Sequence, residues 1–331
     1  MTRLIGITLG DVTGVGPEVA LKALAAELPA DDTRYLLIGD AGWARRMNER
    51  LGLSLALPPA DDAGASERVS ISNPLPDSLP HELAAGSAPA ANAAVAWLQE
   101  GARRCLRGEL DALVTAPVNK AAIVRAGHDF VGQTEFLSQI AGVDRTVMML
   151  LGHDERGRWL RVALATVHVA VRDVASRLTL EKVLLAIQRA AEACRELGLN
   201  RARVAVCGLN PHCGEGGAFG DEEPRLIAPA VARSREMGFD AVGPLSGDTV
   251  FHHALNGAYD AVVAMYHDQG LAPLKAVAFD TGVNWTLGLP FIRTSPDHGT
   301  AYDIAGRGEA NPSSMIAALR LAKQLAQGRR R

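Results

Sequence analysis

Ala261-Val262-Val263-Ala264 runs directly into Met265-Tyr266-His267-Asp268-Gln269-Gly270. The four apolar residues predict a buried strand, and Gly270 predicts the start of a turn behind it. We therefore expect His267 and Asp268 together at the carboxyl end of a buried strand, where ligands bind in open α/β sheets. An imidazole there can bind a divalent metal or move a proton, and the carboxylate beside it can do either.

Short apolar runs alternate with longer amphipathic stretches along the rest of the chain. We expect further strands at 4–9, 35–38, 112–114, 147–151, 162–167, 204–207 and 241–242. We expect helices at 17–26, 41–51, 91–106, 118–126, 135–141, 180–197 and 313–325, the sixth capped by Thr179. Residues 54–90 are rich in Pro, Ala, Ser and Asp and predict loops with an edge strand. Strands that alternate with helices predict an α/β fold with largely parallel sheets.

Length and composition limit the classes of protein to consider. A chain of 331 residues predicts two domains of roughly 150 residues each, with a boundary near Gly127–Gly132. Hydrophobic residues make up 48% of the chain, charged residues 21%, and the net charge is −3, as in ordinary globular proteins. No basic face is evident, which argues against nucleic acid as a partner. No apolar run approaches the roughly 20 residues that would span a membrane.

Cysteine usage and the start of the chain bear on the cellular compartment. The four cysteines form no C-x-x-C pair, and this makes structural disulfides improbable and a reducing compartment the better fit. The first residues turn polar too soon for a signal peptide. We therefore expect a cytoplasmic protein.

Two other histidines share the setting of His267. His168 follows the apolar run 163–167, and His212 follows the run that begins at Val204. Strand ends that converge on one cleft are how α/β enzymes assemble sites, and three imidazoles with an open position suit Zn²⁺, Co²⁺ or Ni²⁺ as a Lewis acid. Their spacing matches no compact zinc motif, so three unrelated histidines stay an alternative.

A cationic group follows His267 along the chain. Lys275, Asn284 and Arg293 combine a point charge, a neutral donor and a forked donor, which together can bind a phosphate. Thr134, after Gly132 at the start of an expected helix, can add a hydroxyl and a helix N-terminus. The alternative for these residues is ordinary surface charge.

Two further segments allow more than one interpretation. Asp248, in the run Gly247-Asp248-Thr249, is either a helix cap or a site carboxylate, and capping is the commoner role. The loop from Gly10 to Glu18 has the spacing G-x₃-G-x-G, which differs from the Rossmann fingerprint. It predicts a tight turn between strand and helix, and no cofactor-binding residue can be assigned from it.

Several of these segments together resemble a known family. They include Gly132-Gln133-Thr134-Glu135-Phe136-Leu137, Leu209-Asn210-Pro211-His212 with Gly214-Glu215-Gly216-Gly217, Tyr266-His267-Asp268-Gln269-Gly270, the stretch 282–294, and Asp297-His298-Gly299-Thr300. In this order they closely resemble the 4-hydroxythreonine-4-phosphate dehydrogenase family of vitamin B6 biosynthesis. The family includes paralogues that act on threonate or erythronate 4-phosphate and on the cis-dihydrodiol of terephthalate. The resemblance covers nearly the whole chain.

The resemblance implies the fold and the assembly. It implies two α/β/α domains around a cleft, as in isocitrate and isopropylmalate dehydrogenases, without a standard Rossmann module. We expect residues 1–130 with 294–331 to form the first domain, and 131–293 to form the second and to carry the metal and phosphate residues. A homodimer is implied, with the metal site shared across its interface.

The resemblance also implies roles for individual residues. The implied metal ligands are His168, His212 and His267, one of them donated across the dimer. The implied substrate-binding residues are Gln133, Thr134, Lys275, Asn284 and Arg293. Asp248 or Asp268 is the nominated proton acceptor. The implied cofactors are NAD or NADP and a divalent metal, Zn, Co or Mg.

The implied reaction is oxidation of the C3 hydroxyl of 4-phosphooxy-threonine, followed by loss of CO₂ to give 3-amino-2-oxopropyl phosphate. Biosynthetic members of the family usually carry His where Gln133 stands, and Gln can donate a hydrogen bond but cannot carry charge. The paralogue substrates therefore stay alternatives, while the retained cations favour a small phosphorylated hydroxy-acid. A metal-dependent phosphate-ester hydrolase is a remote alternative, because the chain lacks a carboxylate-rich pattern for two metals.

Overall fold

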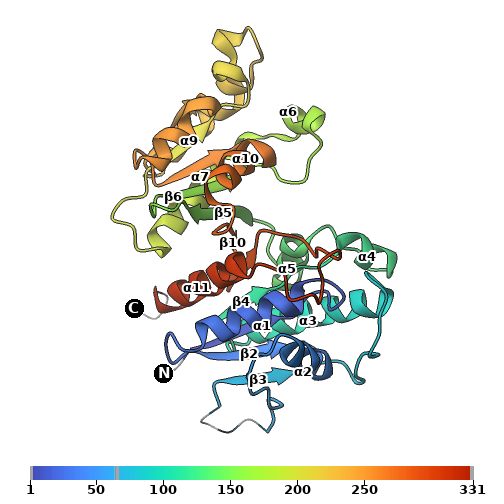
Figure 1. Cartoon of the computed structure of the whole chain (residues 1–331). Helices are drawn as coiled ribbons and strands as arrows, with labels where there is room; N and C mark the ends of the chain where they lie inside the picture. Colours follow the sequence, from blue (N-terminus) through green and yellow to red (C-terminus); the bar gives the residue numbers. More distant parts are fainter. Residues whose placement is uncertain (1–2, 63, 65–66, 329–331) are drawn as a thin grey trace. The chain divides into compact units, whose positions relative to one another are not determined.

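The computed structural model describes residues 3–62, 64 and 67–328, and it divides the chain into two compact units (Figure 1). Unit 1 consists of Met1–Asp144 and Leu289–Arg331, and unit 2 of Arg145–Gly288. The boundaries therefore lie at 144/145 and 288/289, not at the predicted 130/131 and 293/294.

Packing explains why these boundaries differ from the predicted ones. Helix α5 (Gln133–Ala141) packs against α3 (Ala88–Leu106), and strand β11 (Ile292–Pro296) pairs in parallel with β4 (Ala112–Thr115). Both elements flank the predicted breaks and are held by unit 1. Three of the predicted substrate residues, Gln133, Thr134 and Arg293, therefore belong to unit 1, although we had expected them in the second domain.

Unit 1 is built on five parallel strands in the order β3-β2-β1-β4-β11. Besides β4 and β11, the unit contains β1 (Leu4–Thr8), β2 (Arg34–Ile38) and β3 (Val69–Ser72). Strand β3 lies at the edge of this order, inside the segment predicted to hold an edge strand. The remaining helices of the unit are α1 (Gly16–Glu27), α2 (Ala41–Arg50), α4 (Lys120–Arg125) and α11 (Ser313–Gly328).

Helices α1 and α11 lie side by side and share a buried ion pair (Figure 1). Lys323 Nζ in α11 lies 2.6 Å from Glu27 Oε2 in α1 and 3.1 Å from Asp31 Oδ2 just beyond it. Glu27 is 2% exposed and Lys323 is 6% exposed. Charges so far from water are tolerated only when they are paired, so this contact joins the first and last helices of the chain.

Unit 2 has the strand order β10-β5-β6-β9-β7-β8. Its strands are β5 (Val147–His153), β6 (Trp159–Leu164), β7 (Val204–Cys207), β8 (Ala241–Leu245), β9 (Ala261–Ala264) and β10 (Val283–Leu287). Strands β6, β9, β7 and β8 are parallel, whereas β5 is antiparallel to both β6 and β10. The parallel part is the one that carries the predicted histidines.

The helices of unit 2 confirm one predicted cap and correct one predicted turn. They are a 3₁₀ segment at Val171–Asp173, α6 (Val174–Arg177), α7 (Leu180–Glu196), a π segment at Glu223–Ile227, α8 (Ala228–Glu236), α9 (Gly247–Leu255) and α10 (His267–Ala278), while Pro211–Gly217 forms a series of left-handed turns. Thr179 caps α7, since its Oγ1 accepts a hydrogen bond from the Lys182 backbone at 3.3 Å. The predicted turn at Gly270 is wrong, because Gly270 lies inside α10. A Cβ at this position would lie 2.7 Å from Val162, so the glycine lets the helix pack closely on β6.

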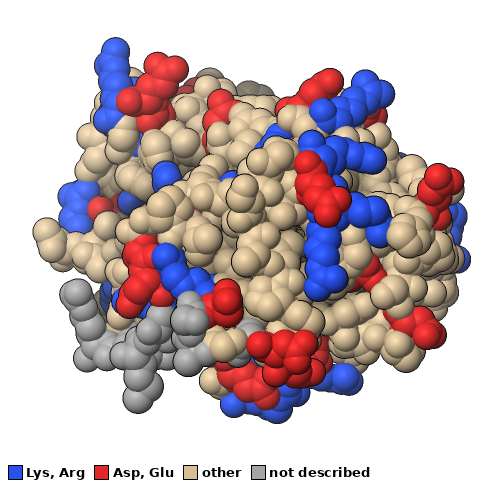
Figure 2. Space-filling model, turned by 60° about the horizontal axis from the view of Figure 1, so that its bottom comes forward, with Lys and Arg blue, Asp and Glu red and all other residues tan. Residues whose placement is uncertain are grey.

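The described helices include none that is both long enough and apolar enough to cross a membrane. On the face shown in Figure 2, cationic and anionic side chains are interspersed. All four cysteines are free.

Candidate functional site

The carboxyl ends of three parallel strands in unit 2 lead to the predicted metal ligands. Strands β6, β9 and β7 are neighbours, so their carboxyl ends lie at one edge of the sheet. The rings of His168 and His267 approach to a centroid separation of 6.0 Å. Among the residues that the structure describes, no three His, Cys, Asp or Glu side chains are placed to hold a metal ion. A single chain therefore brings together two of the three predicted histidines.

Two of the histidines are oriented by a neighbouring carboxylate. His267 Nδ1 lies 2.7 Å from Asp268 Oδ1, and His212 Nδ1 lies 2.8 Å from Glu215 Oε1. With Nδ1 as the donor, Nε2 of each ring is the nitrogen with a lone pair for a metal, and this is the usual arrangement around metal-binding histidines. Glu215 was not predicted, although a carboxylate three residues after a histidine is a signal that could have identified it.

The loop after β7 has an uncommon backbone. His212, Cys213 and Glu215 have φ values of 50°, 57° and 44°, and Gly214 and Gly216 between and after them are also left-handed. The left-handed region is unfavourable for residues with a Cβ. Backbone of this kind clusters at functional sites, where the surroundings hold it. This backbone carries both His212 and its Glu215 partner.

A cavity of about 560 Å³ lies at this edge of unit 2 and is lined by His212, Asp248, Tyr266 and Asp268 among others. Asp248 is the second residue of α9, and Ser246 is the N-cap residue, so Asp248 is not the cap. A hydrogen bond from Ser246 lowers the pKa of Asp248 below its usual value. Asp248 is therefore a carboxylate at neutral pH and faces the same cavity as His212.

Lys275 and Asn284 lie on the last turn of α10 and on β10. Lys275 is half-buried. The Oδ1 atom of Asn284 is buried and has no hydrogen-bond partner within the described part of the chain. Buried polar atoms are nearly always paired, so this acceptor is open to a donor from a water or a ligand.

Arg293 in unit 1 is 2% exposed and lies on β11. Its Nη2 donates to Thr115 Oγ1 at 2.8 Å and to Gln133 Oε1 at 2.9 Å. Burial lowers the pKa of Arg293 to about 10, so the guanidinium still carries its charge at neutral pH. Thr115 was not predicted, because its partner lies 178 residues away in the sequence.

Gln133 and Thr134 begin α5, two residues before the predicted start at residue 135, and Thr134 lies in the first turn as expected. Gln133 uses both ends of its amide within the protein, since its Nε2 donates to the Ala116 carbonyl at 3.3 Å while its Oε1 accepts from Arg293. Thr134, in the first helical turn, is 9% exposed. A helix N-terminus beside a buried cation favours an anion.

The family model described as pyridoxal phosphate biosynthetic protein PdxA matches residues 31–322. The chain belongs to this family.

Individual relatives agree with the family assignment over nearly their full length. The 4-hydroxythreonine-4-phosphate dehydrogenase of Geobacter metallireducens is 47% identical, covering 98% of this chain and 95% of that protein. A relative from Bradyrhizobium diazoefficiens, provisionally named a D-threonate 4-phosphate dehydrogenase, is 40% identical over 99% of this chain and 98% of its own length. The crystal structure of the 4-hydroxythreonine-4-phosphate dehydrogenase of Klebsiella pneumoniae has a TM-score of 0.84 at 39% identity and covers 98% of this chain and 100% of that one. The predicted α/β fold class of the isocitrate and isopropylmalate dehydrogenase type is confirmed.

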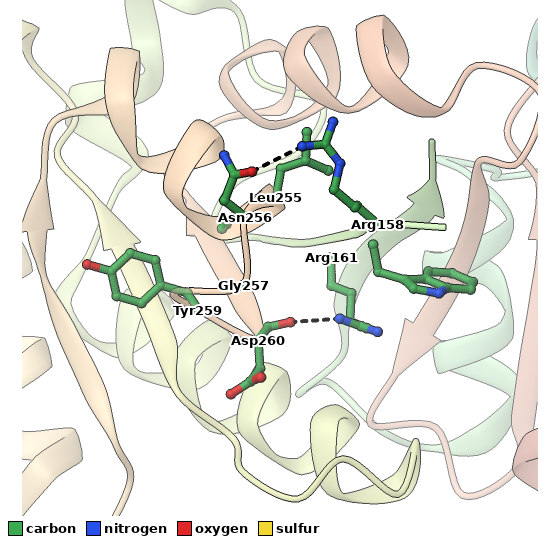
Figure 3. A pocket seen from close by; sticks show the side chains of 9 residues that line it. Arg158, Arg161, Leu255, Asn256, Gly257, Tyr259 and Asp260 are labelled. Carbon is green, nitrogen blue, oxygen red and sulfur yellow. Dashed lines mark hydrogen bonds between the residues drawn. The ribbon is translucent and has the colours of Figure 1, made fainter. Parts of the chain in front are cut away.

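A second cavity of unit 2 has a volume of about 430 Å³ (Figure 3). It lies where β6 and β9 begin, at the opposite ends of these strands from the histidines. Its arginines are engaged within the protein: Arg158 donates to Asn256 Oδ1 at 3.0 Å, and Arg161 donates to the Asp260 carbonyl at 3.2 Å (Figure 3). It contains none of the predicted site residues.

Proposed function

We propose that the chain is a metal- and NAD(P)-dependent dehydrogenase that oxidises the C3 hydroxyl of 4-phosphooxy-threonine, with decarboxylation to 3-amino-2-oxopropyl phosphate. The observation that carries the proposal is the approach of His168 and His267 at the strand ends of a member of this family. Relatives at 40–47% identity over almost the whole chain carry dehydrogenase names.

The side chains fit a divalent metal in their chemistry. Imidazole nitrogens suit Zn²⁺ and Co²⁺ better than Mg²⁺, and the carboxylates at His212 and His267 leave Nε2 as the lone-pair nitrogen. We assign the metal to His168, His212 and His267. When bound, the metal would lower the pKa of the substrate hydroxyl and polarise the developing carbonyl.

The other residues act on the substrate in distinct ways. We assign the substrate phosphate to Thr134, Lys275, Asn284 and Arg293, whose charges and donors match it. We assign proton acceptance to Asp248, which lines the cavity with His212, because Asp268 serves to orient the His267 ring. A bound NAD(P) would supply the hydride acceptor through its nicotinamide ring.

The proposal extends to assembly and compartment. Because one chain brings only His168 and His267 together, a homodimer in which a second copy contributes His212 fits the ligand set. The site would then be shared across the dimer interface. A cytoplasmic setting fits four free cysteines, three of which are buried.

A substrate panel tests the proposal. The protein is incubated with 4-phosphooxy-threonine and NAD or NADP, with and without Zn²⁺, Co²⁺ or Mg²⁺, and reduction of the nucleotide is followed by absorbance. We expect nucleotide reduction that a chelator abolishes and that added metal restores. The absence of turnover with every phosphorylated hydroxy-acid and dihydrodiol of the panel would refute the dehydrogenase assignment. Release of free phosphate without nucleotide would instead favour a hydrolase.

One observation favours a second candidate substrate. Gln133 stands where biosynthetic relatives usually carry His, and its amide is committed to Arg293 and Ala116. Because the Gln133 amide carries no charge and is bonded within the protein, it does not favour a substrate with an amino group over D-threonate 4-phosphate. The ratio of kcat/KM for the two substrates in the same panel decides between them.

A further inference from the structure

We propose that Gln269 is a positioning residue: its amide fixes the loop of His267, which serves one metal site of the proposed dimer, relative to the loop of His212, which serves the other. This inference rests on the proposed metal-dependent function. Gln269 is the third residue of α10. Its Oε1 accepts a hydrogen bond from the Met265 backbone N–H at 2.7 Å, and its Nε2 donates to the Gly208 carbonyl, also at 2.7 Å. One side chain therefore bonds to the ends of both β9 and β7.

Met265 also bonds to the segment after β6, which leads to His168. The Met265 carbonyl accepts hydrogen bonds from Thr166 Oγ1 at 2.7 Å and from the Thr166 backbone N–H at 3.2 Å. Thr166 lies two residues before His168, and Met265 lies two residues before His267. Both residues are buried, with Met265 0% and Thr166 4% exposed, so water does not compete for these hydrogen bonds. Gln269 thus extends a link between β6 and β9 to β7.

A buried carboxylate holds the same loop from its other side. Glu223 is 2% exposed, and its Oε1 accepts hydrogen bonds from the backbone N–H groups of Leu209 and Asn210, both at 2.8 Å. These residues directly precede Pro211 and the left-handed turn at His212. Backbone in this conformation persists only where its surroundings over-determine it. Gln269 and Glu223 together supply such surroundings for residues 208–210.

The chemistry of the link requires an amide. Gln269 donates through one end of its side chain and accepts through the other, which a carboxylate cannot do. In Gln269→Glu the bond to the Met265 N–H survives, while a carboxylate oxygen faces the Gly208 carbonyl. In Gln269→Met the side chain keeps a similar length and loses both bonds. The two variants therefore weaken the link by different amounts without opening a large cavity.

Metal affinity of the full-length protein tests the proposal. Dissociation constants for Co²⁺ and Zn²⁺ are measured by competition with a chromophoric chelator, and the visible absorption of bound Co²⁺ reports the ligand geometry. For Gln269→Met we expect a dissociation constant raised roughly 10–100-fold and an altered Co²⁺ spectrum, with a smaller rise for Gln269→Glu. At saturating metal, kcat should fall more than KM changes. Gln188→Met is the matched control, since Gln188 lies in the same unit and its amide donates to Met237 Sδ at 3.4 Å, away from the strand ends.

The outcomes separate this inference from the function on which it rests. A wild-type protein that binds neither Co²⁺ nor Zn²⁺ overturns the proposed function and this inference with it. Wild-type binding with unchanged affinity and spectrum in both Gln269 variants overturns this inference alone. If Gln269→Met does not fold, Thr166→Val removes the hydroxyl bond to Met265, and we expect a smaller rise in the dissociation constant. Unchanged affinity in that variant and in Gln269→Glu would equally refute the proposal.

Discussion

Unit 1 holds an arginine cluster (Arg293, Thr115 and Gln133) and unit 2 a histidine cluster (His168, His212 and His267). The two clusters are built in opposite ways. Arg293 is 2% exposed and is held by Thr115 and Gln133. The side chains of His267 and His212 are 36% and 63% exposed, and each is held by one carboxylate. A buried cation has its position set by the fold itself, whereas the histidines depend on the loops that carry them. Substitutions should therefore affect the two clusters through different measurable quantities.

The largest effect should follow from His267→Ala. If the exposed histidines serve the metal, this change removes a ligand, and a metal contributes several kcal/mol to the transition state, so kcat/KM should fall roughly 1,000-fold. The fold should persist, because the ring is not part of the core. His253→Ala, an exposed histidine on α9 outside the cavity, is the control and should retain activity. A His267→Ala protein with near wild-type kcat/KM would remove the distinction between the two clusters.

Arg293→Lys should affect both binding and stability. Lysine keeps the charge but cannot donate to Thr115 and Gln133 in the fork geometry. Hydrogen bonds to charged groups contribute about 1.5–3 kcal/mol, so KM for a phosphorylated substrate should rise roughly 10–100-fold. The midpoint of thermal unfolding should also fall, in contrast to His267→Ala. A variant with altered KM and an unchanged midpoint would show that burial of Arg293 contributes little to the fold.

Gln133 tests whether the arginine cluster sets substrate preference. Gln133→Ala removes an acceptor of the buried guanidinium, and we expect a destabilisation of about 1–2 kcal/mol and a KM increase of roughly tenfold for phosphorylated substrates. Gln133→His introduces the side chain that the family resemblance implies for biosynthetic members, and it should raise the preference for 4-phosphooxy-threonine over D-threonate 4-phosphate. Gln139→Ala, exposed on the same helix, is the control. Equal preference ratios in wild type and Gln133→His would show that this position does not select the substrate.

The same contrast explains what could be predicted from the sequence. Apolar runs before His168, His212 and His267 are local patterns, so the strand ends and their convergence at one sheet edge could be inferred, whereas the strand order could not. The position of Thr134 at the start of α5 follows from local signals in the same way. These features depend on residues within a few positions of each other.

Residues that act through distant partners could not be found in this way. Arg293 donates a hydrogen bond to Thr115, 178 residues away in the sequence, and Gln269 donates one to Gly208, 61 residues away. Gly270 was assigned to a turn because its real reason, the close approach of Val162 on β6, is a tertiary contact. The unit boundaries differ from the predicted ones for the same reason, since the packing of α5 on α3 leaves no local pattern in the sequence.

The smallest effect concerns charge away from either cluster, at the joint between α1 and α11 in unit 1. Burial acts to raise the pKa of Asp31, but hydrogen bonds from Thr33 and Lys323 outweigh it and lower the pKa to about 2. A carboxyl with a lowered folded-state pKa stabilises the protein above its unfolded pKa of about 4, and that contribution is lost as the pH falls toward 2. Asp31→Asn should therefore cost about 1 kcal/mol or less at pH 7, after allowance for solvent screening, and almost nothing near pH 2.

Thermal unfolding of wild type and Asp31→Asn from pH 7 to pH 2 checks this expectation. Asp32→Asn, at the exposed neighbouring position, is the control and should show no such convergence. Hydrogen exchange should place the destabilisation in α1 and α11, because Lys323 loses a partner there, and leave β6, β7 and β9 unchanged. A gap between wild type and Asp31→Asn that stays constant down to pH 2 would mean that the Lys323 pair does not hold this carboxyl ionised. Protection lost in unit 2 instead would mean that the buried charges of unit 1 also support the loops of the histidines.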